Sequence, residues 1–232
     1  MFSKIKKLLL FIPCVILIIS LLIINKKEEK LILLIGDNSG VKTHLQEHLT
    51  DYLINDSLSL LTMKSKELSS FICDNVSIIN EGRKSSINLL IKKSNIVVLS
   101  IGFNDLFSKL TLNKYEKKII YDLDSIELMF SLLSQNLNTI IEKILLINKN
   151  TKIIISGYNN PFRSLEDKEF NAIFDKLNSL MNSKSLDYNL FFQENNFKNY
   201  AYYDDEFSCY LNDDGKRKIA ENIYQKIIAI TT

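Results

Sequence analysis

Three stretches of this 232-residue chain combine glycine with amide, hydroxyl or carboxylate side chains. Residues 36–40 read Gly-Asp-Asn-Ser-Gly, residues 102–106 read Gly-Phe-Asn-Asp-Leu, and residues 204–215 carry several aspartates before a glycine. A serine hydroxyl beside a general base can attack an ester carbonyl, and amide N–H groups can stabilise the oxyanion that forms. If the fold brings them together, these stretches could contribute parts of an acyl-transfer site.

Short apolar runs precede the glycines and predict the strands that would position them. Short apolar runs alternate with longer periodic ones, a pattern typical of a parallel sheet covered by helices on both faces. The clear strands are Leu31–Ile35 before Gly36, Ile96–Ile101 before Gly102 and Lys152–Ser156 before Gly157, with Val76–Ile79 as a weaker fourth. Ligands of open α/β sheets bind beyond the carboxyl ends of the strands, so the three glycine loops are the candidate site.

Two periodic segments predict helices against this sheet. Asp124–Ile147 places Leu128, Leu132, Leu137, Ile141 and Ile144 near helical spacing, so we expect one stripe of this helix to pack on the sheet. Asp213–Ile230 begins with acidic residues and repeats Ile219, Ile223 and Ile227 every four residues, as an amphipathic closing helix does. The polar segment Leu112–Tyr121 is expected to be a solvated excursion.

An uncharged apolar run, Leu8–Ile24, is about as long as the shortest stretch that spans a bilayer. Lysines flank it on both sides, and no small-x-small cleavage site follows. We therefore expect residues 1–30 to form a basic leader, a single-pass signal anchor and a linker, and residues 31–232 to form one extracytoplasmic domain. A cleaved signal peptide is the alternative. Cys73 and Cys209 have no metal-ligand spacing and could pair or stay as thiols.

Charge excludes one class of partner. The formal net charge is only +2, with Lys+Arg 29 against Asp+Glu 27. No strongly basic face is expected from this balance, so nucleic acid is not a predicted partner.

In order and spacing, the three stretches resemble the SGNH, or GDSL, hydrolases. That family carries Gly-Asp-Ser after the first strand, Gly-x-Asn-Asp after a middle strand and Asp-x-x-His-Pro before the last helix. Residues 156–162, Ser-Gly-Tyr-Asn-Asn-Pro-Phe, also resemble a Gly-x-Tyr-Asn-Pro-Phe stretch of its membrane-anchored bacterial lipase-like branch. The resemblance implies a three-layer α/β/α, flavodoxin-like fold and an ester or acyl hydrolysis that needs no metal or other cofactor.

The sequence departs from the family at both catalytic positions. Asn38 occupies the position of the serine nucleophile, and an amide cannot form the acyl intermediate. Ser39 is one residue late and could replace the nucleophile only in a remodelled turn; otherwise it caps the following helix. Tyr210 falls at the histidine and Phe207 at its aspartate. Asp205, or its neighbour Asp204, could supply the carboxylate, but a carboxylate without an imidazole activates nothing.

Other family positions are retained. The resemblance assigns Asn104 as a side-chain donor to the oxyanion, while Gly36, Asp37 and Gly102 keep the backbone shape around it. Gly82 is a candidate for the remaining oxyanion donor, although its register is open.

A second motif suggests different chemistry. His44, Glu47 and His48 fit the H-x-x-E-H pattern of inverted zinc peptidases, in which two histidines four apart bind zinc and the glutamate polarises a water. A third ligand would have to come from elsewhere, for example Glu116 or Glu127. The same histidines could also be ordinary positions on a helix.

The sequence therefore predicts a membrane-anchored, SGNH-hydrolase-like protein with incomplete catalytic machinery. Its expected role is to bind a lipid, an acylated glycan or another envelope protein. An active esterase that uses Ser39 is the first alternative, and a zinc hydrolase is the second.

Overall fold

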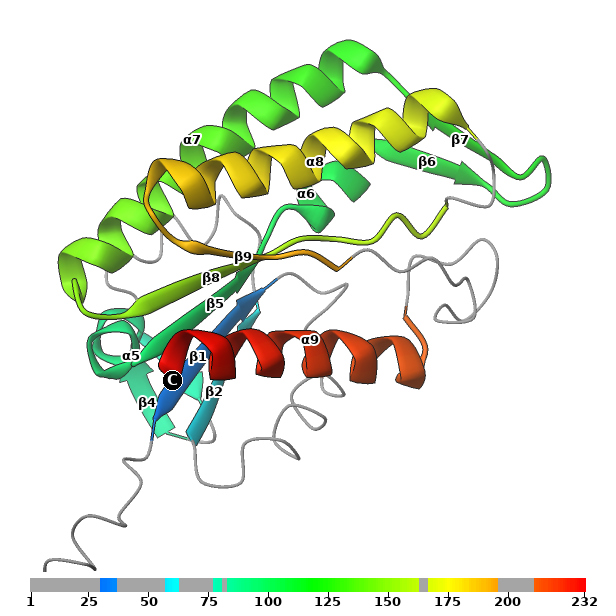
Figure 1. The fold of residues 1–232 in the computed structure, drawn as a ribbon. Helices are drawn as coiled ribbons and strands as arrows, with labels where there is room; N and C mark the ends of the chain where they lie inside the picture. The colour runs from blue at the N-terminus through cyan, green and yellow to red at the C-terminus, as the bar shows by residue number, and fades with distance from the viewer. Residues whose placement is uncertain (1–29, 37–56, 63–76, 81–82, 163–166, 196–210) are drawn as a thin grey trace, which may run out of the picture.

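The computed structural model describes residues 30–36, 57–62, 77–80, 83–162, 167–195 and 211–232. Its centre is a five-stranded parallel sheet in the order β2-β1-β5-β8-β9 (Figure 1). The strands are β1 (Leu31–Gly36), β2 (Ser57–Thr62), β5 (Ile96–Ser100), β8 (Lys152–Ser156) and β9 (Phe191–Gln193). Counted along the chain, these strands have the spatial order 2-1-3-4-5, which is the flavodoxin-like order. The three clear predicted strands are confirmed, whereas β2 and β9 were not predicted.

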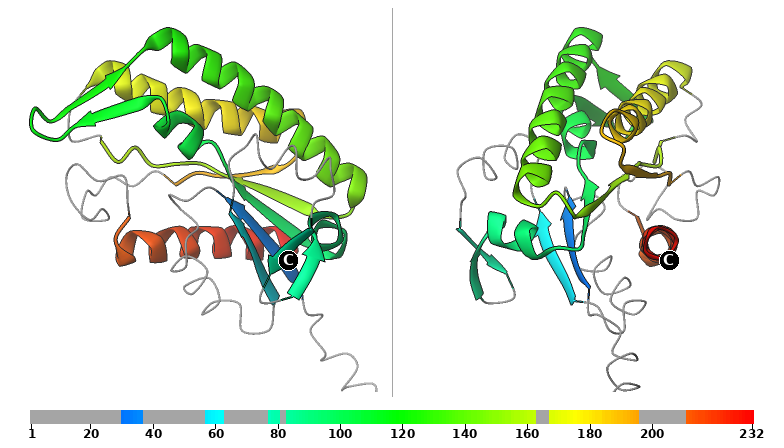
Figure 2. Two further views of the ribbon diagram at one scale, coloured as in Figure 1. Left: turned by 180° about the vertical axis from the view of Figure 1, so that it is seen from behind. Right: turned by 60° about the vertical axis from the view of Figure 1, so that its left-hand side comes forward.

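Helices cover both faces of this sheet, so the described residues form three layers (Figures 1 and 2). Leu33 and Ile35 of β1 contact the cluster beneath one set of helices, and Ile32 and Leu34 contact the cluster on the other face. All four side chains are fully buried. Burial on both faces explains why the strand is a continuous apolar run and does not alternate with polar residues.

The helices are unequally divided between the two faces. α5 (Ile87–Lys93), α6 (Phe103–Phe107), α7 (Leu123–Ile147) and α8 (Lys168–Asp187) contribute to one cluster, and α9 (Asp213–Thr231) contributes to the other. The long helices begin at residues whose side chains accept a backbone N–H. Asp122, Asp167 and Asn212 cap α7, α8 and α9 at 2.9, 3.0 and 3.0 Å.

The prediction for α7 was correct in its second half and wrong in its first. Leu137, Ile141 and Ile144 are buried, but Leu128 and Leu132 are 61% and 51% exposed. The buried stripe instead continues through Ile126, Met129, Phe130 and Leu133, one position away from the two leucines. On α9, Ile223 and Ile227 are buried and Ile219 packs partly against the same cluster, as predicted.

Two antiparallel hairpins lie outside the central sheet. β6 (Leu110–Asn113) pairs with β7 (Lys118–Tyr121), so the segment predicted as a solvated excursion is a hairpin whose turn, residues 114–117, is exposed as expected. Leu110, Leu112, Ile119 and Tyr121 are partly buried and pack against the main core. β3 (Ser77–Asn80) pairs with β4 (Arg83–Ser86), and the predicted strand Val76–Ile79 is therefore not a member of the central sheet.

No helix in the described ranges is long and apolar enough to cross a bilayer. The predicted anchor Leu8–Ile24, together with Cys73 and Cys209, lies outside those ranges.

Candidate functional site

The carboxyl ends of the central strands bring three predicted site residues to one edge of the sheet. The register pairs Gly36, the last residue of β1, with Ser100, the last residue of β5. Gly102 follows two residues later, and Asn104 is the second residue of α6. Gly36 and Gly102 are buried, and Asn104 is half-buried. The described part of the edge therefore has the arrangement that the glycine loops predicted.

The other predicted site residues fall outside the described residues. They are Asp37, Asn38, Ser39, Gly82, Asp205 and Tyr210, and the zinc motif of His44, Glu47 and His48. Of the two glutamates considered as further zinc ligands, Glu127 accepts from Lys176 at 2.6 Å and Glu116 lies 3.7 Å from Lys118.

The turn from β5 into α6 depends on glycine at position 102. Gly102 has a φ of +124°, where side chains are strongly disfavoured. A Cβ atom there would lie 2.7 Å from Met181 Cε and 3.0 Å from Leu133 Cδ2. The backbone conformation therefore favours glycine, and a Cβ would also force the ends of Met181 and Leu133 to shift.

Tyr158 connects the loop after β8 to the loop after β5. The centroids of the Tyr158 and Phe103 rings are 5.5 Å apart. The Tyr158 hydroxyl accepts a long hydrogen bond, of 3.4 Å, from Ser100 Oγ. The third predicted loop is thus adjacent to the second at the same edge.

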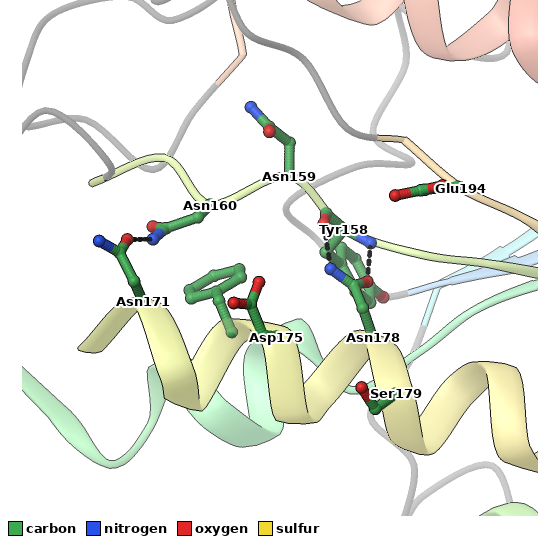
Figure 3. A pocket seen from close by; sticks show the side chains of 9 residues that line it. Tyr158, Asn159, Asn160, Asn171, Asp175, Asn178, Ser179 and Glu194 are labelled. Atoms are coloured by element: carbon green, nitrogen blue, oxygen red, sulfur yellow. Dashed lines mark hydrogen bonds between the residues drawn. The ribbon is translucent and has the colours of Figure 1, made fainter. Parts of the chain in front are cut away.

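A pocket of about 350 Å³ opens beside this loop (Figure 3). Loop residues after β8, one side of α8 and a residue after β9 line it. They are Tyr158, Asn159, Asn160, Asn171, Phe174, Asp175, Asn178, Ser179 and Glu194. Eight of these nine residues carry a polar side-chain group, so the pocket is a polar one.

Two amides hold the loop in place. Asn178 Oδ1 accepts from the Tyr158 backbone N–H and Asn178 Nδ2 donates to the Tyr158 carbonyl, both at 2.7 Å (Figure 3). Asn160 Nδ2 donates to Asn171 Oδ1 at 2.6 Å, and its Oδ1 accepts from the Phe162 N–H at 2.9 Å. The side chains of α8 therefore set the shape of the pocket.

Gly157 allows this close approach. A Cβ atom at Gly157 would lie 2.8 Å from Phe192 Cζ and 2.9 Å from Asn178 Oδ1. Any larger residue would displace the amide that clamps the loop.

A buried asparagine joins the pocket wall to the opposite face of the sheet. Asn195, only 1% exposed, donates to Ser156 Oγ at 2.8 Å and to the Gly157 carbonyl at 3.0 Å. Its Oδ1 accepts from Asn222 of α9 at 3.2 Å. Such a network fixes the ends of β8 and β9 because each buried polar group is satisfied.

Asp175 and Glu194 supply carboxylates from different elements, α8 and the segment after β9 (Figure 3). Both side chains are exposed. They can accept hydrogen bonds from a ligand's hydroxyl or amide groups. Within the described residues, no group of three or more His, Cys, Asp or Glu side chains is arranged to hold a metal ion.

Sequence reasoning identified the loop but not the rest of the pocket. The Ser156–Phe162 stretch contained the family-like residues Tyr158, Asn159 and Asn160. Asn178 and Asp175 lie on α8 and look like ordinary solvent-facing helix residues in the sequence, so no pattern singled them out.

No protein-family model matches the sequence, and no curated protein matches it. Solved structures do match. A lipase from a goat rumen metagenome aligns with a TM-score of 0.54 at 17% identity, over 84% of this chain and 96% of the lipase. The C-terminal catalytic domain of peptidoglycan O-acetyltransferase A from Streptococcus pneumoniae aligns with a TM-score of 0.51 at 13% identity, over 87% and 94% of the two chains.

The chain has the SGNH hydrolase fold. An acetyl xylan esterase from Butyrivibrio proteoclasticus is a further structure of this kind, with a TM-score of 0.56 at 11% identity, over 87% of this chain and 64% of the esterase. At these identities the likeness concerns the SGNH hydrolase fold alone. It confirms the fold that the motifs predicted.

Proposed function

We propose that this protein is a membrane-anchored binding protein that uses the SGNH hydrolase fold to hold an acylated glycan without hydrolysing it. The glycan would occupy the polar pocket, and its acyl group would point toward Gly36 and Asn104.

The main observation against hydrolysis is that no histidine occupies the family's catalytic position. Ester hydrolysis by a serine requires an imidazole that accepts the hydroxyl proton. The chain has two histidines, His44 and His48, and the family's histidine position is Tyr210. Neither His44 nor His48 lies at the family's histidine position, just before the last helix.

The pocket lining supports a glycan over a lipid chain. An acyl chain gains about 25 cal/mol per Å² from apolar surroundings, but Phe174 is the one hydrocarbon side chain among the nine described lining residues. Sugar hydroxyls both donate and accept, and they can donate to the carboxylates of Asp175 and Glu194 and exchange hydrogen bonds with the hydroxyl of Ser179. Two structures of similar fold have names that refer to acetyl groups on glycans, an acetyl xylan esterase and a peptidoglycan O-acetyltransferase.

A fluorophosphonate probe tests whether the protein is catalytic. We expect no labelling of the purified full-length chain under conditions in which an active serine hydrolase is labelled completely. We also expect none in Asn38→Ser, because restoring the hydroxyl does not restore its base. Labelling of the native chain that disappears in Ser39→Ala would refute the proposal and establish the esterase alternative.

Calorimetric titration tests the ligand class. The full-length chain, held in a polyoxyethylene detergent without sugar head groups, is titrated with acetylated xylotetraose and with the tetramer of N-acetylglucosamine. We expect at least one to bind, and we expect Asp175→Asn and Glu194→Gln each to weaken that binding about tenfold, since hydrogen bonds to charged groups contribute about 1.5 to 3 kcal/mol.

Asp187→Asn is the matched control, because Asp187 is an exposed aspartate at the opposite end of α8. Absence of binding by both oligosaccharides, or equal binding by the pocket variants and the control, would contradict the glycan proposal.

A further inference from the structure

A second pocket, of about 340 Å³, lies at the opposite edge of the sheet, where the strands begin. Four of its lining residues are lysines: Lys30, Lys92, Lys93 and Lys152. No aspartate or glutamate is among the described residues that line it. The chain as a whole is nearly neutral, so this concentration of positive charge at one edge is a local feature.

The ends of three helices form the walls of this basic pocket. It contains Ser94, the C-cap of α5, Asn148, the C-cap of α7, and Thr231, the last residue of α9. Helix C-termini carry partial negative charge, so lysines there have an ordinary structural explanation. Lys152 fits that explanation, because its Nζ donates to the Ile230 carbonyl of α9.

Interaction with a helix C-terminus does not explain Lys92 and Lys93 in the same way. The last carbonyls of α5 are already satisfied by Asn148, whose Nδ2 donates to Ile91, Lys92 and Ser94 at 3.1, 3.3 and 2.8 Å. Both lysine side chains are exposed. Their ammonium groups are therefore available to an anion at the mouth of the pocket.

Covalent geometry limits how far this pocket can lie from the proposed anchor. The apolar run ends at Ile24, and Lys30 is itself a lining residue. Six residue steps reach at most about 22 Å, because an extended chain advances at most about 3.6 Å per residue. The intervening charges of Lys26, Lys27, Glu28 and Glu29 cancel. Lys30, the next charged residue along the chain, belongs to the basic pocket.

We propose that the basic pocket binds the phosphate-bearing head groups of anionic phospholipids and holds the amino edge of the domain against the membrane. This inference rests on the membrane anchor in the proposed function. Binding of head groups by the basic pocket would also orient the domain. β1 advances about 20 Å over its six residues, from the edge with the basic pocket to the edge with the glycan pocket. The glycan pocket would therefore face away from the bilayer that carries the anchor.

Lysine footprinting tests the proposal on the native full-length chain. The protein is reconstituted either in nanodiscs of phosphatidylcholine or in nanodiscs that also contain about 30% phosphatidylglycerol, whose head groups give the membrane surface a negative potential. A water-soluble acetylating reagent is applied and labelling of each lysine is quantified by mass spectrometry. We expect labelling of Lys92 and Lys93 to be about fivefold slower in the anionic discs. The attraction of one lysine to an anionic surface corresponds to a factor of about five in its binding equilibrium.

Lys114 is the internal control, because it lies in the exposed β6–β7 hairpin. Its labelling is expected to be equal in both discs. The double variant Lys92→Gln/Lys93→Gln should remove most of the protection of Lys152 in anionic discs, and 0.5 M salt should do the same.

Equal labelling of Lys92 in the two discs, or equal protection of Lys114, would overturn the proposal. A chain that does not enter the discs would overturn it too, through failure of the anchor. Neither result depends on the glycan titration, which is performed in detergent and concerns the opposite edge.

Discussion

Asn178 offers the sharpest test of how the ligand pocket is built. Asn178→Ala removes two hydrogen bonds of 2.7 Å, one to the N–H and one to the carbonyl of Tyr158. Each such bond contributes about 0.5 to 1.5 kcal/mol, so we expect the free energy of unfolding to fall by about 2 kcal/mol. With a urea m-value of about 2 kcal/mol/M, the midpoint should fall by about 1 M.

The measurement is urea unfolding of the full-length chain followed by far-ultraviolet circular dichroism. Asn182→Ala is the matched control: Asn182 lies one turn further along α8, its side chain is exposed, and its amide oxygen takes part only in a 3.4 Å contact with Ser185 Oγ. A change within about 0.5 kcal/mol is expected there.

Asn178→Ala should also weaken oligosaccharide binding at least tenfold, because the loop from Tyr158 to Asn160 loses its attachment to α8. A midpoint shift no larger than that of Asn182→Ala would refute the clamp. A full shift with unchanged binding would show that the clamp serves stability alone.

Three further predictions concern other parts of the chain. Gly102→Ala should lower the unfolding free energy by at least about 2 kcal/mol, from backbone strain at φ +124° and overlap with Met181; an unchanged urea midpoint would contradict this. Burial, aided by the 2.7 Å bond to Glu142, raises the pKa of Tyr188 to about 12. The folded pKa exceeds the unfolded one, so this stabilisation is complete below pH 10 and declines as the pH rises toward 12; thermal melts of Tyr188→Phe should lose less stability over that interval. Metal analysis of the purified full-length chain should find no stoichiometric zinc, and zinc that is lost in His44→Ala would favour the hydrolase alternative.

Continuous burial made the central strands predictable. β1, β5 and β8 are flanked by strands on both sides and covered by helices on both faces, so their central residues are all apolar. β2 reads Ser-Leu-Ser-Leu-Leu-Thr and lies at one end of the sheet order, and β9 has only three residues. Neither produces a long apolar run, which explains why both were missed.

Helix periodicity gave the correct helix but not the complete buried face. Met129, Leu133, Leu137 and Ile141 repeat every four residues, whereas Leu132 and Leu137 are five residues apart. The prediction therefore joined parts of two adjacent apolar stripes into one face. The buried stripe is the one that keeps the four-residue spacing through the whole helix.

The positions of the candidate site residues were predictable where a motif coincided with a strand end. Gly36, Gly102 and Asn104 were placed correctly at one edge because glycine followed an apolar run in each case. Glu194 and Asn195 follow the short strand β9, and their contribution depends on where that strand pairs. Such residues become recognisable only once the topology is known.

The position of β1 also determines how the domain would resist a pulling force. β1 is paired along its length with β2 on one side and with β5 on the other. A chain anchored before Lys30 and bound at the opposite edge to an acylated glycan, as proposed above, would be pulled along the axis of β1. The parallel hydrogen bonds on both sides of the strand would then share the load in shear and would have to fail together, so the topology suits a tether under tension.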